Sequence, residues 1–329
     1  PDLRWSFAGY HVPQIVMPMH YADPEKWQKL IDKMQGKGNT PLHVFYNEVC
    51  GESWDSGSKL VTVTDLKKAA CLPWRRDLAE AKQNKDGYLH TFCSVDWGGG
   101  GVNKGKSDLA LQSYTSIAVC GLTADGRVDV IYGFRSMNPH DHVREAKVIL
   151  GIMNTFGCSH LVHDYTGAGT VRETILRQAG LPLNNILPVA YTGPAKGGII
   201  IYKPATDNHP RSHYTMDRNR AINYCCQFIK SNVIRFFQYD YKGSEDVGLL
   251  HDFLHLIEDK TDSGAGRGSY KILRDPAGPD DFAQAVTMGT MMLFQMQGRW
   301  PDLSAYEDIR VPDEVLATTR GPDTLDWEG

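Results

Sequence analysis

A run of seven segments between Tyr88 and Tyr191 constrains the fold of this 329-residue chain more than any other feature. The first three segments read as strands and the next four alternate between helix and strand; they cover residues 89–97, 114–122, 127–135, 140–156, 158–165, 169–180 and 186–191. Thr-Ala-Asp-Gly joins the second and third strands and is typical of a tight hairpin. Gly157 follows the first helix where a helix would stop. Strands mixed with helices in this order place the chain in the α/β class.

The flanking segments are less regular. After this run we expect a helix over 217–231, a strand over 233–237, a helix near 245–254, a glycine-rich hairpin loop over 262–269 and a last helix over 280–296. Residues 1–85 hold short apolar pieces, an amphipathic helix over 24–34 and a further helix for which Thr64 is the expected N-cap. We therefore predict three parts: the end of another domain with a linker (1–85), the main domain (86–297) and a C-terminal tail (298–329).

Composition excludes several classes of protein. A hydrophobic content of 41% and a charged content of 22% describe a soluble globular protein, and no apolar run reaches the ~20 residues of a membrane helix. The net charge of −4 argues against a protein held on nucleic acid by bulk electrostatics. The seven cysteines show no C-x-x-C spacing, so we infer a reducing cytoplasm and interpret Cys225 and Cys226 as core residues. Because Pro1 rather than Met begins the chain, we expect a fragment or a processed piece.

The stretch VDWGGGGVNKGKS, residues 95–107, has two incompatible interpretations. From Gly100 to Ser107 it fits G-x-x-x-x-G-K-S, the phosphate-binding loop of nucleotide hydrolases. That loop must run directly into a helix, but DLALQSY and a hairpin strand follow here, and no clear second acidic motif appears downstream. We therefore favour the other interpretation, a strand that ends in the carboxylate Asp96 and is followed by glycines.

Other acids occupy similar places. Asp164 ends the fourth strand and is also followed by glycines, and Asp280 and Asp281 open the last helix. If the first and fourth strands are neighbours, Asp96 and Asp164 lie side by side, and the helix can add a third acid. Clustered carboxylates repel one another, and Mg²⁺ or Mn²⁺ would remove that penalty. Two such ions can promote phosphodiester cleavage, and the glycines would let a phosphate backbone approach.

Each acid also has a purely structural interpretation. Asp164 could cap the helix that follows it, and Asp280 is a natural N-cap with Asp281 in the favoured first turn. Asp96, at the end of an apolar strand, is the hardest to explain in this way. The joint placement of these acids at the ends of converging elements favours the metal site.

Three motifs, VDWGGGG, HLVHDYTGAG and PDDFAQAVTMG, resemble the nuclease domain of tailed-phage terminase large subunits, the DNA-packaging motors. The segment HVFYNEVCGESWDSGSKLVTVTDLKKA resembles the linker between their ATPase and nuclease domains, and WSFAGYHVPQIVMP resembles the end of the ATPase. The resemblance covers roughly residues 5–297 and implies a ribonuclease H-like mixed sheet flanked by helices. In that sheet the first three strands are antiparallel and the next two are parallel to the first.

The resemblance also implies the site residues. It places the catalytic and metal-binding acids at Asp96, Asp164 and Asp281, with Asp280 as the alternative to Asp281. Residues that could contact DNA are basic or aromatic-flanked positions outside the acids: Lys104, Lys106, Arg211, His213, Arg218 and Arg220. His163 points to the opposite side of its strand from Asp164 and is better interpreted as a core histidine. The loop over 262–269 could sit over a duplex.

The implied activity is that of a Mg²⁺- or Mn²⁺-dependent endonuclease that cuts double-stranded DNA at the start and end of genome packaging and leaves 3′-hydroxyl and 5′-phosphate ends. Its expected partners are double-stranded DNA, the terminase small subunit, the portal or procapsid and the ATPase domain, in the host cytoplasm and away from membranes. No nucleotide is expected in this fragment. Alternatives are a junction resolvase, a transposase-like enzyme, a nucleotide-driven motor that uses Gly100–Ser107, and a docking module without nuclease activity.

Overall fold

The computed structural model describes residues 13–34, 49, 59–98, 114–136, 141–193, 198–207, 210–239, 248–261, 269–275, 278–298 and 300–301. The chain divides into two compact units, Pro1–Lys59 and Leu60–Gly329. The first contains a 3₁₀ turn, η1 (Gln14–Val16), and two helices, α1 (Pro18–Tyr21) and α2 (Pro24–Met34), of which α2 was predicted. The three-part division of the chain stays a prediction. Among the described residues no helix is long and apolar enough to cross a membrane.

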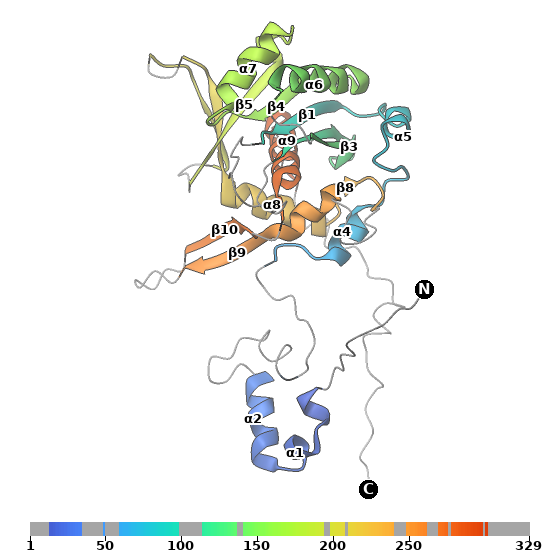
Figure 1. The fold of residues 1–329 in the computed structure, drawn as a ribbon, viewed down its shortest axis with the longest axis vertical. Helices are drawn as coiled ribbons and strands as arrows, with labels where there is room; N and C mark the ends of the chain where they lie inside the picture. The colour runs from blue at the N-terminus through green and yellow to red at the C-terminus, as the bar shows by residue number, and fades with distance from the viewer. Residues whose placement is uncertain are drawn as a thin grey trace. The chain divides into compact units, whose positions relative to one another are not determined.

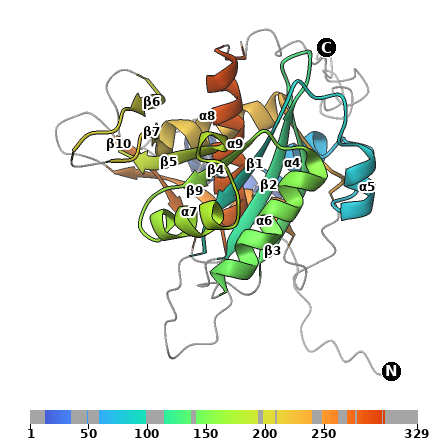
Figure 2. The same ribbon diagram turned by 90° about the horizontal axis from the view of Figure 1, so that it is seen from above.

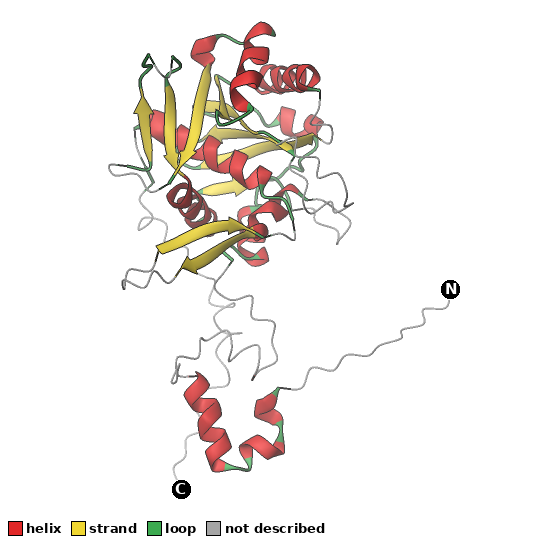
Figure 3. Cartoon of the chain, turned by 60° about the vertical axis from the view of Figure 1, so that its left-hand side comes forward, coloured by secondary structure: helices red, strands yellow, loops and turns green. Residues whose placement is uncertain are grey.

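An eight-stranded sheet forms the centre of the second unit (Figures 1 and 3). Its strand order is β6-β7-β5-β4-β1-β2-β3-β8. The strands are β1 (His90–Asp96), β2 (Thr115–Leu122), β3 (Val128–Ser136), β4 (His160–Asp164), β5 (Ile186–Thr192), β6 (Ile200–Lys203), β7 (His213–Asp217) and β8 (Ile234–Phe236). A separate hairpin pairs β9 (Leu256–Thr261) with β10 (Ser269–Arg274).

The strand directions confirm the expected fold class. Strands β1, β2 and β3 pair antiparallel, β4 pairs parallel with β1, and β5 pairs parallel with β4. These are the strand directions that the resemblance implied, and they make the first and fourth strands neighbours, which the side-by-side placement of Asp96 and Asp164 requires. Beyond this core, β7 joins β5 and β8 joins β3, both in parallel.

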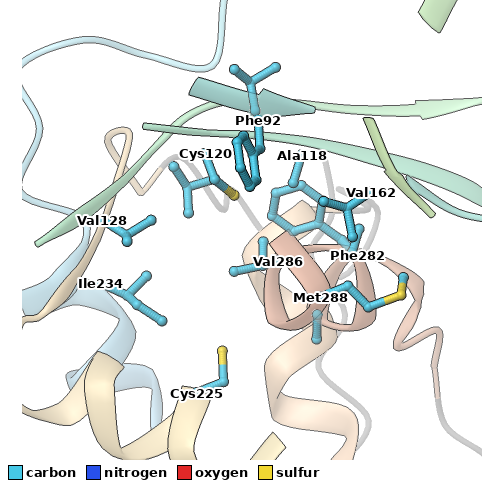
Figure 4. Close-up of a cluster of buried hydrophobic side chains, with 14 of the residues drawn as sticks. Phe92, Ala118, Cys120, Val128, Val162, Cys225, Ile234, Phe282, Val286 and Met288 are labelled. Atoms are coloured by element: carbon cyan, nitrogen blue, oxygen red, sulfur yellow. The ribbon is translucent and has the colours of Figure 1, made fainter. Parts of the chain in front are cut away.

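Helices cover both faces of the sheet (Figures 1 and 2). On one face lie α6 (His142–Phe156) and α7 (Gly169–Gln178), and on the other α8 (Arg218–Lys230) and α9 (Asp281–Gln297). The alternation of side chains along a strand produces the two faces. In β2, Ile117 lines a cleft against α6, whereas the neighbouring Ala118 belongs to the cluster around α9 (Figure 4). The remaining elements of the unit are α4 (Val63–Ala69), α5 (Leu78–Gln83) and the 3₁₀ segments η5 (Leu183–Asn185) and η6 (Leu249–His255).

Helix α9 is the hydrophobic centre of the unit. Every residue from Asp281 to Phe294 is buried, so the helix has no solvent face over that length. It lies very close to the sheet at Gly289, where an added Cβ would be 2.9 Å from Ser94 Cβ and 3.1 Å from Cys120 Sγ. Glycine is therefore required at this contact, because a larger residue would push the helix off β1 and β2.

Four predictions about local structure were wrong or incomplete. Thr62, not Thr64, is the N-cap of α4; its hydroxyl accepts from Asp65 N–H while the Asp65 carboxylate accepts from Thr62 N–H, a capping box. Strand β7, over residues 213–217, was not predicted; it pairs with β5 and β6. Strand β6 was not predicted. The helix expected near 245–254 is, where described, the 3₁₀ segment η6.

Other expectations are confirmed. Gly157 ends α6 in the left-handed conformation with φ of 63°, and Cys225 and Cys226 are buried in the core. The hairpin β9–β10 flanks the predicted glycine-rich loop, most of which lies outside the described residues.

Candidate active site

The register between β1 and β4 brings Asp96 and Asp164 together. In this parallel pair, Phe92 lies opposite His160 and Ser94 opposite Val162. Two residues further along each strand, on the same face, come Asp96 and Asp164. Ser94 contacts the α9 position Gly289, so this is the face that α9 covers. Both acids therefore lie at the same edge of the sheet and on the α9 side.

The first turn of α9 brings the other two acids to this place. Asp280 is the N-cap residue, but its side chain makes no capping bond. Its Oδ2 instead accepts from Gln284 Nε2 at 2.8 Å and from Arg218 Nη2 at 3.4 Å. Asp281 Oδ2 accepts the backbone N–H of Tyr114 at 3.1 Å. Asp280 is thus held by Arg218 and by Gln284 of its own helix, without capping that helix, whereas Asp281 is held by the backbone of another segment.

The other three acids all act on Asp96. Burial raises the pKa of Asp96 well above its ordinary value, and the charges of Asp281, Asp164 and Asp280, in that order, raise it further. Arg218 opposes this effect. The other sequence-predicted acids therefore lie close enough to Asp96 to disfavour its ionised form. In the described part of the chain, however, no group of three or more His, Cys, Asp or Glu side chains is arranged as a formed metal site.

Asp164 is oriented locally by Thr166. Its Oδ1 accepts from the backbone N–H of Thr166 at 2.8 Å and from the Thr166 hydroxyl at 2.7 Å. The N-cap of α7 is Ala168, without a side-chain capping bond, so the interpretation of Asp164 as a cap for that helix was wrong. The carboxylate is instead held by Thr166 at the strand end.

Gly169 lets α7 begin directly behind Asp164. A Cβ at Gly169 would lie 2.0 Å from the carbonyl oxygen of Asp164. The requirement for glycine after this acid thus comes from the protein's own backbone. The earlier explanation, that the glycines clear space for a phosphate backbone, is not needed at this position.

On the opposite face of the sheet, a buried polar network joins the two strand ends. His163 Nδ1 lies 2.9 Å from the carbonyl oxygen of Asp164 and 3.2 Å from Trp97 Nε1, and His163 Nε2 lies 3.1 Å from Glu173 Oε2. Glu173 Oε1 accepts from Arg211 Nε at 2.8 Å. Burial would raise the pKa of Glu173, but its bonds to His163 and Arg211 outweigh burial and lower it. The interpretation of His163 as a core histidine is confirmed.

Arg172 extends this network to the segment after Asp96. Its Nη2 donates to the carbonyl of Gly98 at 2.8 Å, and its guanidinium lies 4.9 Å from the centre of the Trp97 ring. The side chain is buried. Helix α7 therefore holds the end of β1 through Arg172 and the end of β4 through Glu173 and Gly169. We refer to Trp97, His163, Arg172, Glu173 and Arg211 as the buried polar network.

The predicted DNA-contacting residues lie in different surroundings. Arg211 belongs to the buried polar network, and His213 stacks on Tyr165 at 5.8 Å between ring centres. Arg218 donates to the carbonyl of Ile272 at 2.7 Å and reaches Asp280, which places it beside the acids. Arg220 is half-buried in the first turn of α8. Lys104 and Lys106 lie outside the described residues, as does the P-loop-like stretch Gly100–Ser107; their DNA contacts stay predictions.

Sequence reasoning missed Tyr191 as a neighbour of the acids. Its Oη is buried and has no hydrogen-bond partner among the described residues. Burial raises the pKa of Tyr191, and the charges of Asp96 and Asp164 add to this effect while Arg218 opposes it. The signal available in the sequence was the alternation of side chains along a strand. Val189 pairs with Asp164, and Tyr191 is two residues beyond Val189, so the side chains of Tyr191 and Asp164 lie on the same face of the sheet.

A second missed feature is an ion pair at the other side of the acids. Arg135 Nη2 contacts Asp252 Oδ2, and the same oxygen accepts the backbone N–H of Phe282 at 2.7 Å. Burial raises the pKa of Asp252 to about 7 despite the opposing effect of Arg135. This pair fixes the start of α9, next to Asp281. Nothing in the local sequence around Asp252 indicated it.

Comparison with known proteins identifies similar solved structures. The nuclease of the large terminase from thermophilic phage G20c, solved with bound magnesium, is 12% identical, with a TM-score of 0.42 over 72% of this chain and 98% of that one. The HK97 bacteriophage large terminase is 12% identical, with a TM-score of 0.44 over 82% of this chain and 50% of that one. The nuclease domain of gp2 from bacterial virus Sf6 is 11% identical, with a TM-score of 0.39 over 66% and 97%.

The chain thus spans the nuclease structures almost completely and about half of the HK97 protein. No family model and no curated protein matches the sequence. These three structures are a phage large terminase and the nuclease parts of two others, and the three acidic motifs of this chain resemble the same family.

Proposed function

We propose that this chain is a metal-dependent endonuclease, the nuclease part of a phage terminase large subunit, which hydrolyses double-stranded DNA when genome packaging begins and ends. The observation that carries the proposal is the convergence of Asp164, Asp280 and Asp281 on Asp96 at one edge of the sheet. These residues come from three segments far apart in the sequence. The resemblance of the three acidic motifs to terminase nucleases supports the specific role in packaging.

The donor set fits a hard divalent cation. Carboxylate oxygens are the ligands that Mg²⁺ and Mn²⁺ prefer, and the repulsion that raises the pKa of Asp96 is what a dication would relieve. We assign Asp96, Asp164 and Asp281 as the ligands of one or two ions. Asp281 has the largest effect of the neighbouring carboxylates on Asp96, whereas Asp280 is engaged by Gln284 and Arg218, so Asp280 stays the alternative. When bound, such ions activate water and stabilise the leaving oxygen.

The chain itself supplies orientation. Thr166 fixes the carboxylate of Asp164, and the N–H of Tyr114 fixes that of Asp281. Arg218 favours the ionised form of Asp96, because a nearby positive charge lowers the pKa of a carboxyl group. These contacts pre-set the acids, so that little reorganisation is needed when substrate arrives.

The test is cleavage of supercoiled plasmid in Mn²⁺ by the whole chain. Asp96→Asn, Asp164→Asn and Asp281→Asn should each lose more than about 10²-fold in rate, because even partners of metal ligands are worth 10–100-fold. Asp280→Asn should lose less. Asp86→Asn, at an exposed position just before β1, is the matched control and should cut normally. Full activity in Asp96→Asn, or an equal loss in Asp86→Asn, refutes the assignment.

Further assays separate the alternatives. A strong preference for branched DNA favours a junction resolvase, and strand-transfer products favour a transposase-like enzyme. ATP binding that is lost in Lys106→Ala favours the nucleotide-driven motor. A chain that neither cuts DNA nor binds Mn²⁺ in calorimetry is better explained as a docking module.

A further inference from the structure

Tyr191 lies at the end of β5 on the face that carries the acids. In the parallel pair of β4 and β5, Val189 lies opposite Asp164. Tyr191 follows Val189 by two residues and so leaves the sheet on the same side, one step further toward the open edge. The charges of Asp96, Arg218 and Asp164 all act on its hydroxyl. Its position is thus beside the proposed metal ligands, on the neighbouring strand.

The hydroxyl of Tyr191 is a donor whose partner is missing from the described part of the chain. Its Oη is buried and makes no hydrogen bond there. A buried hydroxyl without a partner costs roughly 1–3 kcal/mol. Tyr88 shows the usual solution in this protein, because its hydroxyl donates to Asp129 Oδ2 at 3.1 Å. The Ser94 hydroxyl also lacks a partner, but it is enclosed between β1 and α9, whereas Tyr191 lies among charged groups.

We propose that Tyr191 is a catalytic residue whose hydroxyl donates a hydrogen bond to a non-bridging oxygen of the scissile phosphate. This inference rests on the proposed nuclease function, and it adds a substrate contact that the acidic motifs do not include. A tyrosine hydroxyl is protonated at neutral pH and can donate. A phosphate held at the acids by cations would bring an oxygen acceptor next to this hydroxyl, which has no partner among the described residues.

A donor aimed at the phosphate is worth more as negative charge develops on its oxygens. The proposal therefore predicts an effect on the rate of cleavage, not on DNA affinity or on metal binding. Arg218 also acts on this hydroxyl, but its guanidinium already donates to the carbonyl of Ile272 and to Asp280. No covalent bond to Tyr191 is involved.

The test is Tyr191→Phe in the whole chain, which removes one oxygen atom and keeps the ring. We expect the single-turnover rate of plasmid cleavage in Mn²⁺ to fall about 100-fold, in line with the loss of one transition-state donor. The protein concentration that gives half-maximal cleavage and the rise in melting temperature caused by Mn²⁺ should stay unchanged. Tyr132→Phe is the matched control, because Tyr132 is a buried tyrosine stacked on Phe156 and its neighbouring charges are Arg76 and Asp77, not the acids. It should cut at the wild-type rate.

Two outcomes overturn the proposal. Cleavage by Tyr191→Phe within about twofold of wild type means that the hydroxyl has no catalytic role. Loss of the Mn²⁺-induced rise in melting temperature means that it serves the metal site and not the phosphate. Failure of the proposed function itself is distinguishable, since in that case the wild-type chain would show no cleavage that depends on Asp96.

Discussion

Replacing Gly169 by alanine tests whether α7 packs against the backbone of Asp164 as closely as the structure shows. The new Cβ would lie 2.0 Å from the carbonyl oxygen of Asp164 and 3.0 Å from the carbonyl carbon. Ordinary van der Waals contact begins near 3.4 Å, so the helix start and the strand end must separate by more than an ångström. The obstructing atoms belong to backbone and cannot rotate away.

The expected cost follows from that overlap. Overpacking a well-filled site costs about 1–3 kcal/mol, and a clash with backbone falls at the upper end. For a domain of this size a loss of about 3 kcal/mol lowers the melting temperature by roughly 6–12 °C. Because Asp164 itself is displaced by about 1 Å, plasmid cleavage should also fall by about 100-fold.

Gly151→Ala is the matched control. It makes the same glycine-to-alanine change, but it is expected to raise the free energy of unfolding and not to lower it. Gly151 is exposed in the middle of α6, and an added Cβ there meets nothing within 4 Å. Alanine at this position should stabilise the protein by about 0.5–1 kcal/mol. The assays are chemical denaturation and plasmid cleavage. Wild-type stability and wild-type cleavage in Gly169→Ala would refute the close approach of α7 to Asp164.

Three further predictions concern metal, pH and the buried polar network. Mn²⁺ at about 100 times its dissociation constant should stabilise the wild-type chain by about 2.7 kcal/mol in thermal unfolding, and Asp96→Asn should abolish this gain. In EDTA, Asp96→Asn should be more stable than the wild-type chain, because it removes a carboxylate that the other acids repel. An unchanged Mn²⁺ effect in Asp96→Asn would count against the site. Burial, and then the charge of His90, lower the pKa of His160. Its contribution to stability is therefore present above the unfolded pKa of about 6.5 and is lost as the pH falls through the lower folded pKa. His160→Gln should reduce the pH dependence of stability in urea unfolding over that window, and a profile identical to wild type would exclude His160 as its origin. Glu173→Ala leaves His163 and Arg211 without their shared acceptor and should cost about 3 kcal/mol in denaturant unfolding, whereas a loss under 1 kcal/mol would mean that the network contributes little.

The sequence was most informative where one periodicity was sustained. The strand that ends at Asp96 and the helix that begins at Asp281 were predicted close to their observed bounds, since long apolar patterns identify such elements without tertiary information. Strand β7, with the sequence HYTMD, was missed because a five-residue strand that mixes polar and apolar residues carries little pattern of its own. Its pairing with β5 and β6 supplies the stabilisation.

The residues of the candidate site also differ in whether the sequence alone predicts them. The acids could be proposed because each ends or begins an element with a clear pattern and carries a chemically distinctive side chain. Tyr191 and the pair of Arg135 with Asp252 could not, because their roles depend on strand register and on contacts between segments that are more than a hundred residues apart. The choice between Asp280 and Asp281 likewise depends on which partner each carboxylate meets, and neighbouring residues in one sequence motif do not reveal that.

The helix that presents Asp281 is also the one that the core is built around. Its deep contact at Gly289 is eight residues from Asp281, or about 12 Å along the helix axis. Because a helix moves as a rigid unit, a displacement at Gly289 also displaces its first turn. An apolar substitution in the middle of α9 should therefore first reduce the rate of cleavage. Selection for tight packing and selection for catalysis would then act on the same residues, and mutational tolerance along this helix should be lower than hydrophobicity alone would allow.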